Sequence, residues 1–403
     1  MLSPFVEIQS RLAAHTDLRF KRYLYNTIDW ETRLFAVIGP RGIGKTTMLL
    51  QHYREVYNNP AACLYVSADN IKAQAVGLYE IAGEFFRCGG KLLLLDEVHR
   101  YPNWTAEVKS IYDSWPTGRV GLSGSSMLGM LSGGADLSRR LVTYRMQGLS
   151  FREYLALSQR MDIAAVSLDQ LLENHTTIAA DSLAVAGGTI VNHFRQYLTH
   201  GIYPFFVESE VLYQSRLENV IEKVLSDDIP SVTGIRPESI PVLRRLVFMV
   251  ASAQPFVPNI ERMATVLGVS RETIYRYLQE LAQAGLFSLL AAPGAGMKAV
   301  RKPAKVLLEN PNLFPAILGS SGLEGRIGAM RESFFHHQIS LVAKLTSDNK
   351  LDFRTRDGTG FEIGGRSKSE KQLANDPQAW LAVDDTEIGS GRRVPLWLFG
   401  LLY

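Results

Sequence analysis

The chain contains few cysteines and no long hydrophobic run. Its two cysteines, Cys63 and Cys88, are far apart in the sequence and show no metal-ligand spacing, and two cysteines in 403 residues do not indicate a disulfide framework. We expect both to be buried thiols in a reducing compartment. No apolar run approaches the roughly 18–20 residues that cross a bilayer. The C-terminal VPLWLFGLLY, residues 394–403, is too short for that and is predicted to be a core strand.

The chain also lacks an excess of charge of either sign. Lys and Arg number 43, Asp and Glu number 40, and the net charge is +3 in 403 residues. Bulk charge therefore does not indicate nucleic-acid binding, and any basic surface must be local. The N-terminal residues show no basic stretch followed by an apolar one, so we expect a cytoplasmic protein without a membrane partner. The length predicts two or three domains.

A phosphate-binding loop follows the first apolar strand. Leu34–Ile38 is rich in strand formers, and residues 39–46 read GPRGIGKT, which fits G-x-x-x-x-G-K-[ST] between a strand and a helix. The glycines let backbone N–H groups face a phosphate, and the helix that follows directs its positive end to the same place. The residues expected to contact ATP are Gly39, Pro40, Arg41, Gly42, Ile43, Gly44, Lys45, Thr46 and Thr47.

Two acids after a run of four leucines complete the predicted ATP site. KLLLLDE, residues 91–97, indicates a strand buried on both faces of a parallel sheet, and ligands bind beyond the carboxyl ends of such strands. Lys45 is expected to reach the β- and γ-phosphates, while Thr46 and Asp96 hold Mg²⁺. Glu97 can orient or deprotonate the attacking water, which favours an ATP hydrolase over a kinase or a switch GTPase.

The strand order predicts further polar groups near the γ-phosphate. Further strands are expected at residues 62–67, 119–126 and 141–150, and the strand ending at Leu122 would separate the phosphate-loop strand from the acidic strand. Its tip presents Ser123 or Ser125 to the γ-phosphate, unless this is a plain polar turn. Arg139 and Arg140 precede the fifth strand and either stabilise transition-state charge, in the same subunit or across an interface, or form structural ion pairs.

These segments together resemble the prokaryotic AAA-type (AAA+) P-loop ATPases whose ATPase module precedes a C-terminal segment of unknown function with a restriction-endonuclease-like ending. The stretches that carry the resemblance are GPRGIGKTTMLLQ, GGKLLLLDEVHRYPNW, GLSGSSMLG, DLSRRLVTYRMQGLSFREYL, YLTHGIYPFF and PLWLFGLLY. The resemblance covers nearly the whole chain. It implies ATP and Mg²⁺ binding at the positions argued above and leaves the physiological role open.

The predicted fold class is therefore α/β. We expect a P-loop NTPase core over residues 1–150, with a five-stranded parallel sheet and an extra strand between the Walker A and Walker B strands. Apolar residues at helical spacing then predict a helical lid over residues 151–235. A winged helix is expected over residues 236–310, and a small restriction-endonuclease-like domain, degenerate in its site, over residues 311–403.

A helix-turn-helix pattern carries the winged-helix prediction. Residues 258–287 place apolar residues on one face of each helix, Ser270 is a natural N-cap, and a basic hairpin with a Pro-Gly tip follows. Such a unit can insert its second helix into a major groove and lay its hairpin along phosphates, or it can contact proteins or be purely structural. The residues predicted to contact DNA are Arg271, Thr273, Arg276, Lys298, Arg301 and Lys302; Lys305 is a further basic residue of the hairpin.

The C-terminal segment carries three acids in a nuclease-like arrangement. Glu332 lies on a predicted helix, and Asp352 and Glu362 lie on two predicted strands. The lysine expected two residues after Glu362 is absent because Gly364 stands there, and Lys368 lies further along. This departure indicates a degenerate site and makes nuclease activity unlikely.

Three whole-protein functions are compatible with these patterns. The first is an ATPase whose hydrolysis changes the conformation of a winged-helix and nuclease-like module on double-stranded DNA. The second is an ATP-dependent switch that binds protein partners or further copies of the chain without nucleic acid. The third is an ATP-dependent nuclease.

Overall fold

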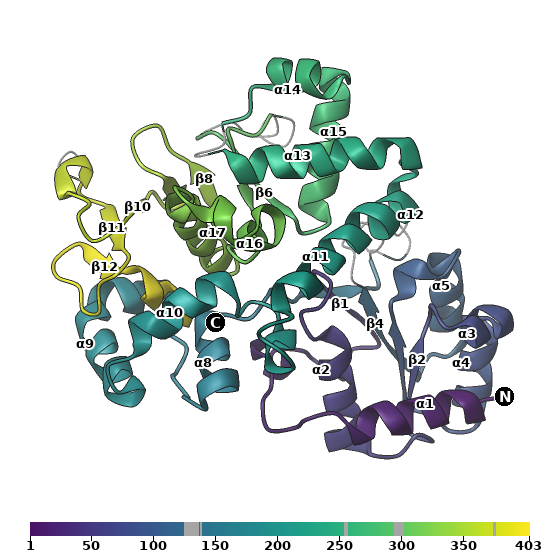
Figure 1. The fold of residues 1–403 in the computed structure, drawn as a ribbon. Helices are drawn as coiled ribbons and strands as arrows, with labels where there is room; N and C mark the ends of the chain where they lie inside the picture. Colours follow the sequence, from purple (N-terminus) through teal and green to yellow (C-terminus); the bar gives the residue numbers. More distant parts are fainter. Residues whose placement is uncertain (125–136, 138, 254–256, 294–301, 374–375) are drawn as a thin grey trace. The chain divides into compact units, whose positions relative to one another are not determined.

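The computed structural model describes residues 1–403 except 125–136, 138, 254–256, 294–301 and 374–375 (Figure 1). The chain divides into two compact units. The first contains Met1–Gly148 and Asp227–Ile235, and the second contains Leu149–Ser226 and Arg236–Tyr403. The first unit therefore includes a short segment that lies about eighty residues beyond its main part in the sequence. Within the described part of the chain, no helix is both long and apolar enough to cross a membrane.

A parallel five-stranded sheet forms the centre of the first unit. Its order is β2-β3-β4-β1-β5, so β4 lies between the phosphate-loop strand β1 and the acidic strand β3, as predicted. The predicted α/β class with this extra strand is confirmed. The strands are β1 (Leu34–Ile38), β2 (Cys63–Ser67), β3 (Leu92–Asp96), β4 (Arg119–Gly124) and β5 (Val142–Arg145).

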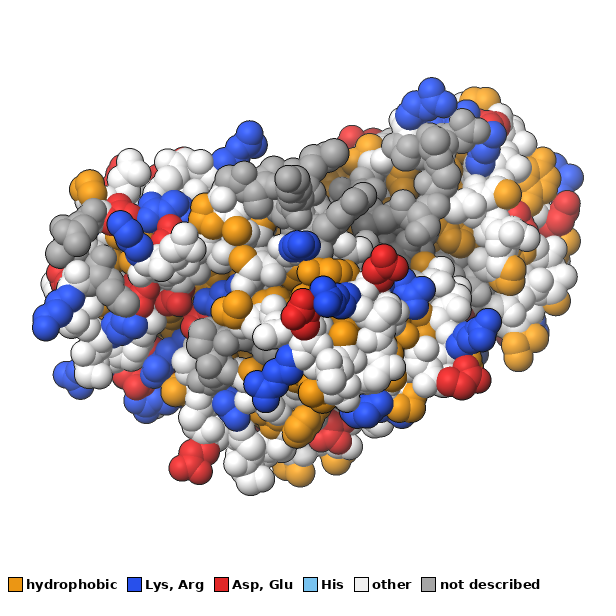
Figure 2. Space-filling view, turned by 90° about the horizontal axis from the view of Figure 1, so that it is seen from above, with side chains coloured by type: hydrophobic (Ala, Val, Ile, Leu, Met, Phe, Trp, Pro, Cys, Tyr) orange, Lys and Arg blue, Asp and Glu red, His pale blue; other side chains and the backbone are white. Residues whose placement is uncertain are grey.

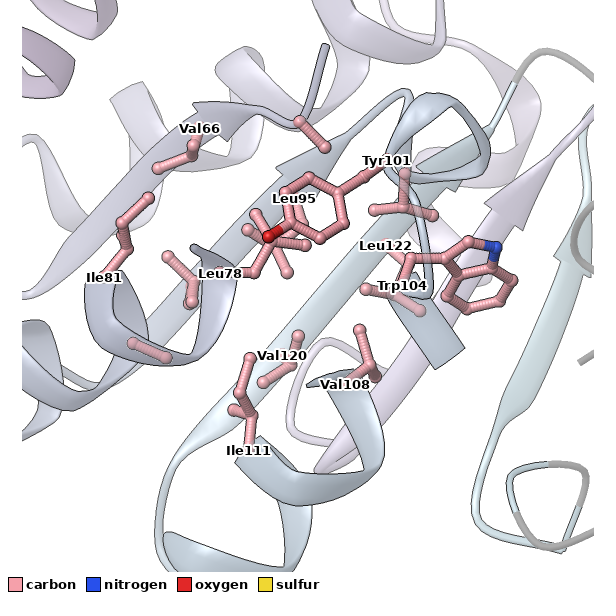
Figure 3. Packing of buried hydrophobic residues seen from close by; sticks show 14 of the residues in the cluster. Val66, Leu78, Ile81, Leu95, Tyr101, Trp104, Val108, Ile111, Val120 and Leu122 are labelled. Carbon is pink, nitrogen blue, oxygen red and sulfur yellow. The ribbon is translucent and has the colours of Figure 1, made fainter. Parts of the chain in front are cut away.

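Helices pack on this sheet and bury its central strands. They are α1 (Ser3–Ala14), α2 (Lys45–His52), α3 (Ile71–Val76), α4 (Leu78–Arg87) and α5 (Trp104–Ser114). The segment 227–235 adds a short helix, α12 (Ile229–Thr233), to the first unit. Figure 3 shows Ile81 of α4 and Val108 of α5 turned toward the sheet, where they pack with strand residues such as Leu95. All five residues of β3 are buried, which confirms that the leucine run is a doubly covered strand.

The second unit begins with helices and continues into two small sheets. Its first helices are α8 (Phe151–Gln159), α9 (Leu168–Ala186), α10 (Ile190–Thr199) and α11 (Tyr213–Lys223), followed by α13 (Ile240–Ser252), α14 (Ile260–Leu267) and α15 (Arg271–Gln283). An antiparallel pair follows, made of β6 (Phe287–Leu290) and β7 (Lys305–Leu308). Ser270 caps α15 by accepting a hydrogen bond from the Thr273 amide, as expected of an N-cap.

A mixed five-stranded sheet lies in the last part of the second unit. After α16 (Leu313–Leu318) and α17 (Ile327–Ile339), the strands are β8 (Leu345–Ser347), β9 (Phe353–Thr355), β10 (Gly360–Gly364), β11 (Ala379–Val383) and β12 (Arg393–Pro395). Their order is β12-β11-β10-β9-β8, with β10, β11 and β12 parallel. The predicted strands around Phe353, Glu362 and Leu381 are present.

Two predictions about apolar residues were wrong. Only the short edge strand β12 forms near the C-terminus, and Leu396–Leu401 is a buried 3₁₀ helix instead of a core strand. A continuous apolar run indicates burial but does not distinguish a strand from a buried helical turn. Cys63 is buried as expected, whereas Cys88 is exposed at the end of α4.

Candidate nucleotide site and the acidic cluster of the second unit

The phosphate loop lies between β1 and α2, where the chain makes a tight turn. Gly42 and Gly44 adopt φ angles of 83° and 96°, which side chains with a Cβ rarely allow. A Cβ on Gly39 would lie 2.1 Å from the Met146 carbonyl oxygen, so only glycine fits there. The loop therefore needs these glycines to curl its backbone N–H groups toward the amino end of α2.

Lys45 is buried at the start of α2 and is held by the loop itself. Its Nζ donates hydrogen bonds to the carbonyl oxygens of Gly39, at 2.9 Å, and Pro40, at 2.7 Å. Burial lowers the pKa of Lys45 to about 8, and the nearby charges of Glu97 and Asp96 oppose that shift. An ammonium that bonds to two carbonyl oxygens can exchange them for phosphate oxygens when a nucleotide enters.

Asp96, at the end of β3, is surrounded by donors that carry no charge. Its carboxylate accepts hydrogen bonds from Thr46 Oγ1 at 2.6 Å, from the Tyr65 hydroxyl at 2.7 Å and from the Glu97 amide at 3.1 Å. The Ser123 hydroxyl, at the end of β4, donates a further one. The sheet thus brings together Thr46, Asp96 and Ser123, three residues predicted from the sequence to share one site.

The contact between Thr46 and Asp96 fits a magnesium ion. A hydroxyl and a carboxylate are hard oxygen ligands, and Mg²⁺ in such sites is completed by water and by phosphate oxygens of the nucleotide. Among the described residues, no group of three or more His, Cys, Asp and Glu side chains is arranged to hold a metal ion. Thr46 and Asp96 would supply two of the ligands of the ion, and water and nucleotide phosphate oxygens would supply the others.

Tyr65 is a contact of Asp96 that the sequence analysis missed. It lies on β2, the parallel neighbour of β3, two residues before Ser67, which is opposite Asp96. Burial, and then the charge of Asp96, raises the pKa of the Tyr65 hydroxyl, so it remains a donor. Tyrosine on a predicted strand usually indicates core packing, so the sequence carries no distinct signal for this role.

Glu97 follows Asp96 in a backbone conformation that turns it away from the strand. Its φ of 53° is in the left-handed region, which non-glycine residues seldom occupy and which is often found at functional sites. The carboxylate lies 3.7 Å from His99 Nε2 and 3.8 Å from Arg100 Nε. Burial lowers the pKa of His99 to about 4, so this imidazole is neutral at pH 7. The arrangement holds Glu97 at the strand end, beside the Walker residues.

Asp228 joins the same site from the segment that returns to the first unit. Its buried carboxylate lies 3.2 Å from Arg41 Nη1, in the phosphate loop, and 3.1 Å from Arg100 Nη2. No motif connects Asp228 to the loop, because the two are separated by more than 180 residues of sequence. Only the tertiary structure brings it to the site.

Of the remaining residues predicted for the ATP site, the structure describes the two arginines. Arg140 lies near the amino ends of the strands, where it pairs with Asp113 at 3.3 Å and contacts the Tyr112 ring. The phosphate loop follows the carboxyl end of β1, so the geometry does not support action of Arg140 within its own subunit. Arg139 is exposed just before β5, and Ser125 lies outside the described residues. A role of Arg139 or Arg140 across an interface stays a prediction.

The residues predicted to contact DNA are partly engaged with acids. Arg271 lies 3.0 Å from Glu261, and Arg276 lies 3.8 Å from Glu280 on the same helix, α15. The hydroxyl of Thr273 lies 2.9 Å from the N-cap hydroxyl of Ser270. Lys302 is exposed, and Lys298 and Arg301 lie outside the described residues. Lys305 was expected on the basic hairpin but is buried and takes part in the acidic cluster described next.

The three acids of the nuclease-like segment are brought together, and two lysines neutralise them. Lys305 Nζ pairs with Glu332 of α17 and lies 3.5 Å from Asp352 Oδ1. Lys368 Nζ lies 2.6 Å from Glu362 Oε1. We call these five residues, Glu332, Asp352, Glu362, Lys305 and Lys368, the acid–lysine cluster. Burial, and then the charge of Asp352, raises the pKa values of Glu332 and Glu362.

Gly364 explains how Lys368 reaches this cluster. A Cβ at position 364 would lie 2.6 Å from both Cβ and Cγ of Lys368. The lysine side chain thus passes through the space that a longer residue at 364 would occupy. Glycine occupies position 364, two residues after Glu362, where a nuclease of this type has lysine. In the structure, Lys368 contacts Glu362 instead, from four residues further along the chain.

Comparisons with known proteins agree with the site in the first unit. Residues 31–155 match an AAA domain, and residues 191–324 match a domain of unknown function (DUF8612). An uncharacterized protein of Methanocaldococcus jannaschii, MJ1637, is 26% identical over 284 residues, which are 68% of this chain and 60% of that protein. The alignment thus spans less than two thirds of this relative. The AAA-domain match and the sheet order support a P-loop ATPase that binds nucleotide.

Solved structures with some similarity include two forms of a replication initiator. AMPPCP-bound DnaA from Aquifex aeolicus is 15% identical, with a TM-score of 0.28 over 69% of this chain and 88% of that one. Domain III of DnaA from Thermotoga maritima is 15% identical, with a TM-score of 0.25 over 59% and 89%. PCH-2 from C. elegans is 13% identical, with a TM-score of 0.24 over 42% and 47%. These scores are too low to add to the argument.

Proposed function

We propose that this protein is a magnesium-dependent ATPase. The observation that carries the proposal is the direct contact of Thr46 with Asp96 beside the buried Lys45, with Glu97 at the end of the same strand. These are the groups that hold the phosphates, hold the ion and face the attacking water in P-loop ATPases. The ATP hydrolase assignment depends on Glu97, because nucleotide binding alone does not need a second acid at this position.

The residues of this chain have distinct tasks in the proposed reaction. The loop amides and Lys45 bind the β- and γ-phosphates, and Thr46 and Asp96 hold Mg²⁺, which neutralises charge on the phosphate oxygens when bound. Glu97 accepts a proton from the water that attacks the γ-phosphate. His99 and Arg100 keep the Glu97 carboxylate at the strand end, and the Ser123 hydroxyl donates a hydrogen bond to Asp96.

We further propose that hydrolysis changes the conformation of the second unit on double-stranded DNA in the cytoplasm. The order of α14, α15, β6 and β7 supports the winged-helix assignment, and the mixed sheet beside α17 supports the nuclease-like one. We assign the helices from α8 to α11 to the lid. Arg271, Thr273, Arg276 and Lys302 are the described residues assigned to the DNA contact, and Arg139 or Arg140 to a contact between copies of the chain.

A second candidate is an ATP-dependent switch that binds a protein. Both Arg271 and Arg276 face glutamates, and positive and negative side chains are interspersed on the face drawn in Figure 2. A hollow of about 620 Å³ between α13 and α14 is mostly apolar and is lined in part by the exposed side chains of Phe248 and Val266. Apolar hollows of this kind suit a protein segment better than a phosphate backbone.

A nuclease function is disfavoured by the acid–lysine cluster. Lys305 places its ammonium between Glu332 and Asp352, where a catalytic cation would need to bind. A divalent ion would be repelled by that charge unless Lys305 left the cluster. We therefore propose that this segment serves binding or stability.

The candidates are separated by steady-state ATP hydrolysis with and without duplex DNA at two salt concentrations. The first predicts stimulation by DNA that disappears at high salt, because phosphate contacts release counterions. Arg276→Gln should reduce that stimulation, whereas Arg216→Gln, an exposed arginine of α11 paired with Glu208, should not. Hydrolysis indifferent to DNA favours the protein switch. Tight ATP binding without turnover contradicts the ATPase proposal itself.

A further inference from the structure

Asp228 is a buried acid at the nucleotide site that none of the P-loop motifs accounts for. Its side chain is 2% exposed, yet it carries a carboxylate, which requires charged or hydrogen-bonding partners at this depth. Those partners are Arg41, in the phosphate loop, and Arg100, just beyond Glu97. Both arginines therefore connect Asp228 to the residues proposed to bind and hydrolyse ATP.

Charges of both signs meet at the site of the first unit. Lys45, Arg41 and Arg100 supply the positive charges, and Asp96, Glu97 and Asp228, with Asp69 at 3.9 Å from Arg100, supply the negative ones. Triphosphate with one magnesium ion adds net negative charge to this group. Phosphate oxygens are strong acceptors for guanidinium groups, so they compete with the Asp228 carboxylate for Arg41 and Arg100.

Asp228 lies where the chain passes from the second unit to the first, so loss of its ion pairs to phosphate would affect this connection. Asp228 is the last residue of a π-helical segment, Val224–Asp228, and the boundary between the two units falls within it, after Ser226. Short π-helical segments recur at functional sites. Residues 227–235 then form the segment that belongs to the first unit, and the chain passes back to the second unit at Arg236. A change at Asp228 therefore acts on the covalent connection between the units.

We propose that Asp228 is a positioning residue whose carboxylate competes with nucleotide phosphates for Arg41 and Arg100, so that a bound nucleotide releases both arginines from Asp228. Release loosens residues 227–235, so the connection between the units responds to nucleotide occupancy. The inference rests on the proposed ATP site and adds the element that transmits its state. Asp69 is a useful contrast, because it also faces Arg100, at 3.9 Å, but lies outside that segment and is more exposed.

The test is amide hydrogen exchange of the full chain with and without a non-hydrolysable ATP analogue. In the unchanged protein, the analogue should accelerate exchange across residues 227–235 about fivefold, including the Gly234 amide that bonds to the Pro230 carbonyl. In Asp228→Asn, exchange should be fast with or without the analogue, and the analogue should bind about fivefold more tightly. Asp228→Glu should restore the nucleotide response, and Asp69→Asn should leave both properties unchanged.

Two results would overturn the inference. The first is an exchange rate over residues 227–235 that the analogue lowers or does not alter in the protein without substitutions. This measurement does not depend on the folding of any variant. The other is equal or weaker analogue binding by a folded Asp228→Asn protein. Failure of the unchanged protein to bind the analogue at all would instead overturn the proposed ATP site, so the two failures are distinguishable.

Discussion

The two units each gather acidic side chains at one place, but they compensate those acids differently. In the first unit, Asp96 accepts hydrogen bonds from Thr46, Tyr65 and Ser123, none of which carries a charge. In the second unit, Glu332 and Asp352 face the ammonium of Lys305. Neutral donors leave the charge of Asp96 available to a cation, whereas an ammonium takes the place of one. The buried acid of the first unit is thus suited to a metal ion, and the partly buried acids of the second unit are suited to a structural ion pair.

The largest effect should come from removing the cation that faces the phosphates in the first unit. Lys45→Ala should reduce nucleotide binding by at least about 100-fold, because a charge-assisted contact inside a buried site is lost. Fluorescent nucleotide titration measures this, and a thermal unfolding profile like that of the unchanged protein shows that the fold survives. Unchanged affinity would remove the P-loop assignment.

Glu97 separates binding from hydrolysis in the same unit. Glu97→Gln should bind ATP normally but turn it over roughly 100- to 1,000-fold more slowly, because the amide cannot accept the proton of the attacking water. Single-turnover hydrolysis and nucleotide titration distinguish the two steps. Normal turnover would show that the base is another residue. Glu107→Gln, an acid of α5 that bonds to Tyr101, is a matched control with normal turnover expected.

A substitution of Lys305 tests whether its ammonium compensates the acids of the second unit. Lys305→Met should destabilise the second unit by about 2–4 kcal/mol, because it leaves the partly buried Glu332 and Asp352 without their cation. Added Mg²⁺ or Ca²⁺ should then recover part of the loss in the variant and have no such effect on the unchanged cluster. Urea unfolding with and without the ions measures both. Lys368→Met should also be destabilising, because the Glu362 carboxylate that would lose its cation is only 6% exposed.

Glu280, an acid of α15, has one carboxylate oxygen that neither a neutral donor nor a cation in the described part of the chain compensates. Its Oε2 is buried without a hydrogen-bond partner among the described residues, and burial raises its pKa to about 7, against the opposing charge of Arg276. The folded state therefore keeps a proton that the unfolded state loses near pH 4.5, so this acid lowers stability as the pH rises toward 7.

Glu280→Gln should consequently stabilise the protein by about 1–2 kcal/mol at pH 8 and by almost nothing at pH 4. Urea unfolding at the two pH values measures the difference. Glu272→Gln, an exposed acid on the same helix, should change stability by less than about 0.5 kcal/mol at either pH. A gain for Glu280→Gln that does not vary with pH would contradict the assigned cause.

The nucleotide site could be predicted well where short segments determine it. GPRGIGKT specifies a turn that only glycine-rich sequence can make, and four leucines before Asp96 specify a strand covered on both faces. Parallel strands end at one edge, so Thr46 and Asp96 had to approach one another. The strand predicted for the C-terminal apolar run was wrong, because burial alone does not determine whether a segment is extended or helical.

The sequence by itself thus determined the phosphate loop, the acidic strand and the α/β class, since each follows from local backbone geometry or from burial along a strand. Only the tertiary structure decided which distant side chains complete each site: Tyr65 and Asp228 in the first unit, and Lys305 and Lys368 in the second. Lys305 and Arg271 look equally basic in sequence. Folding buries one against two carboxylates and leaves the other exposed, because the partner of a charge is set by contacts between residues far apart in the chain.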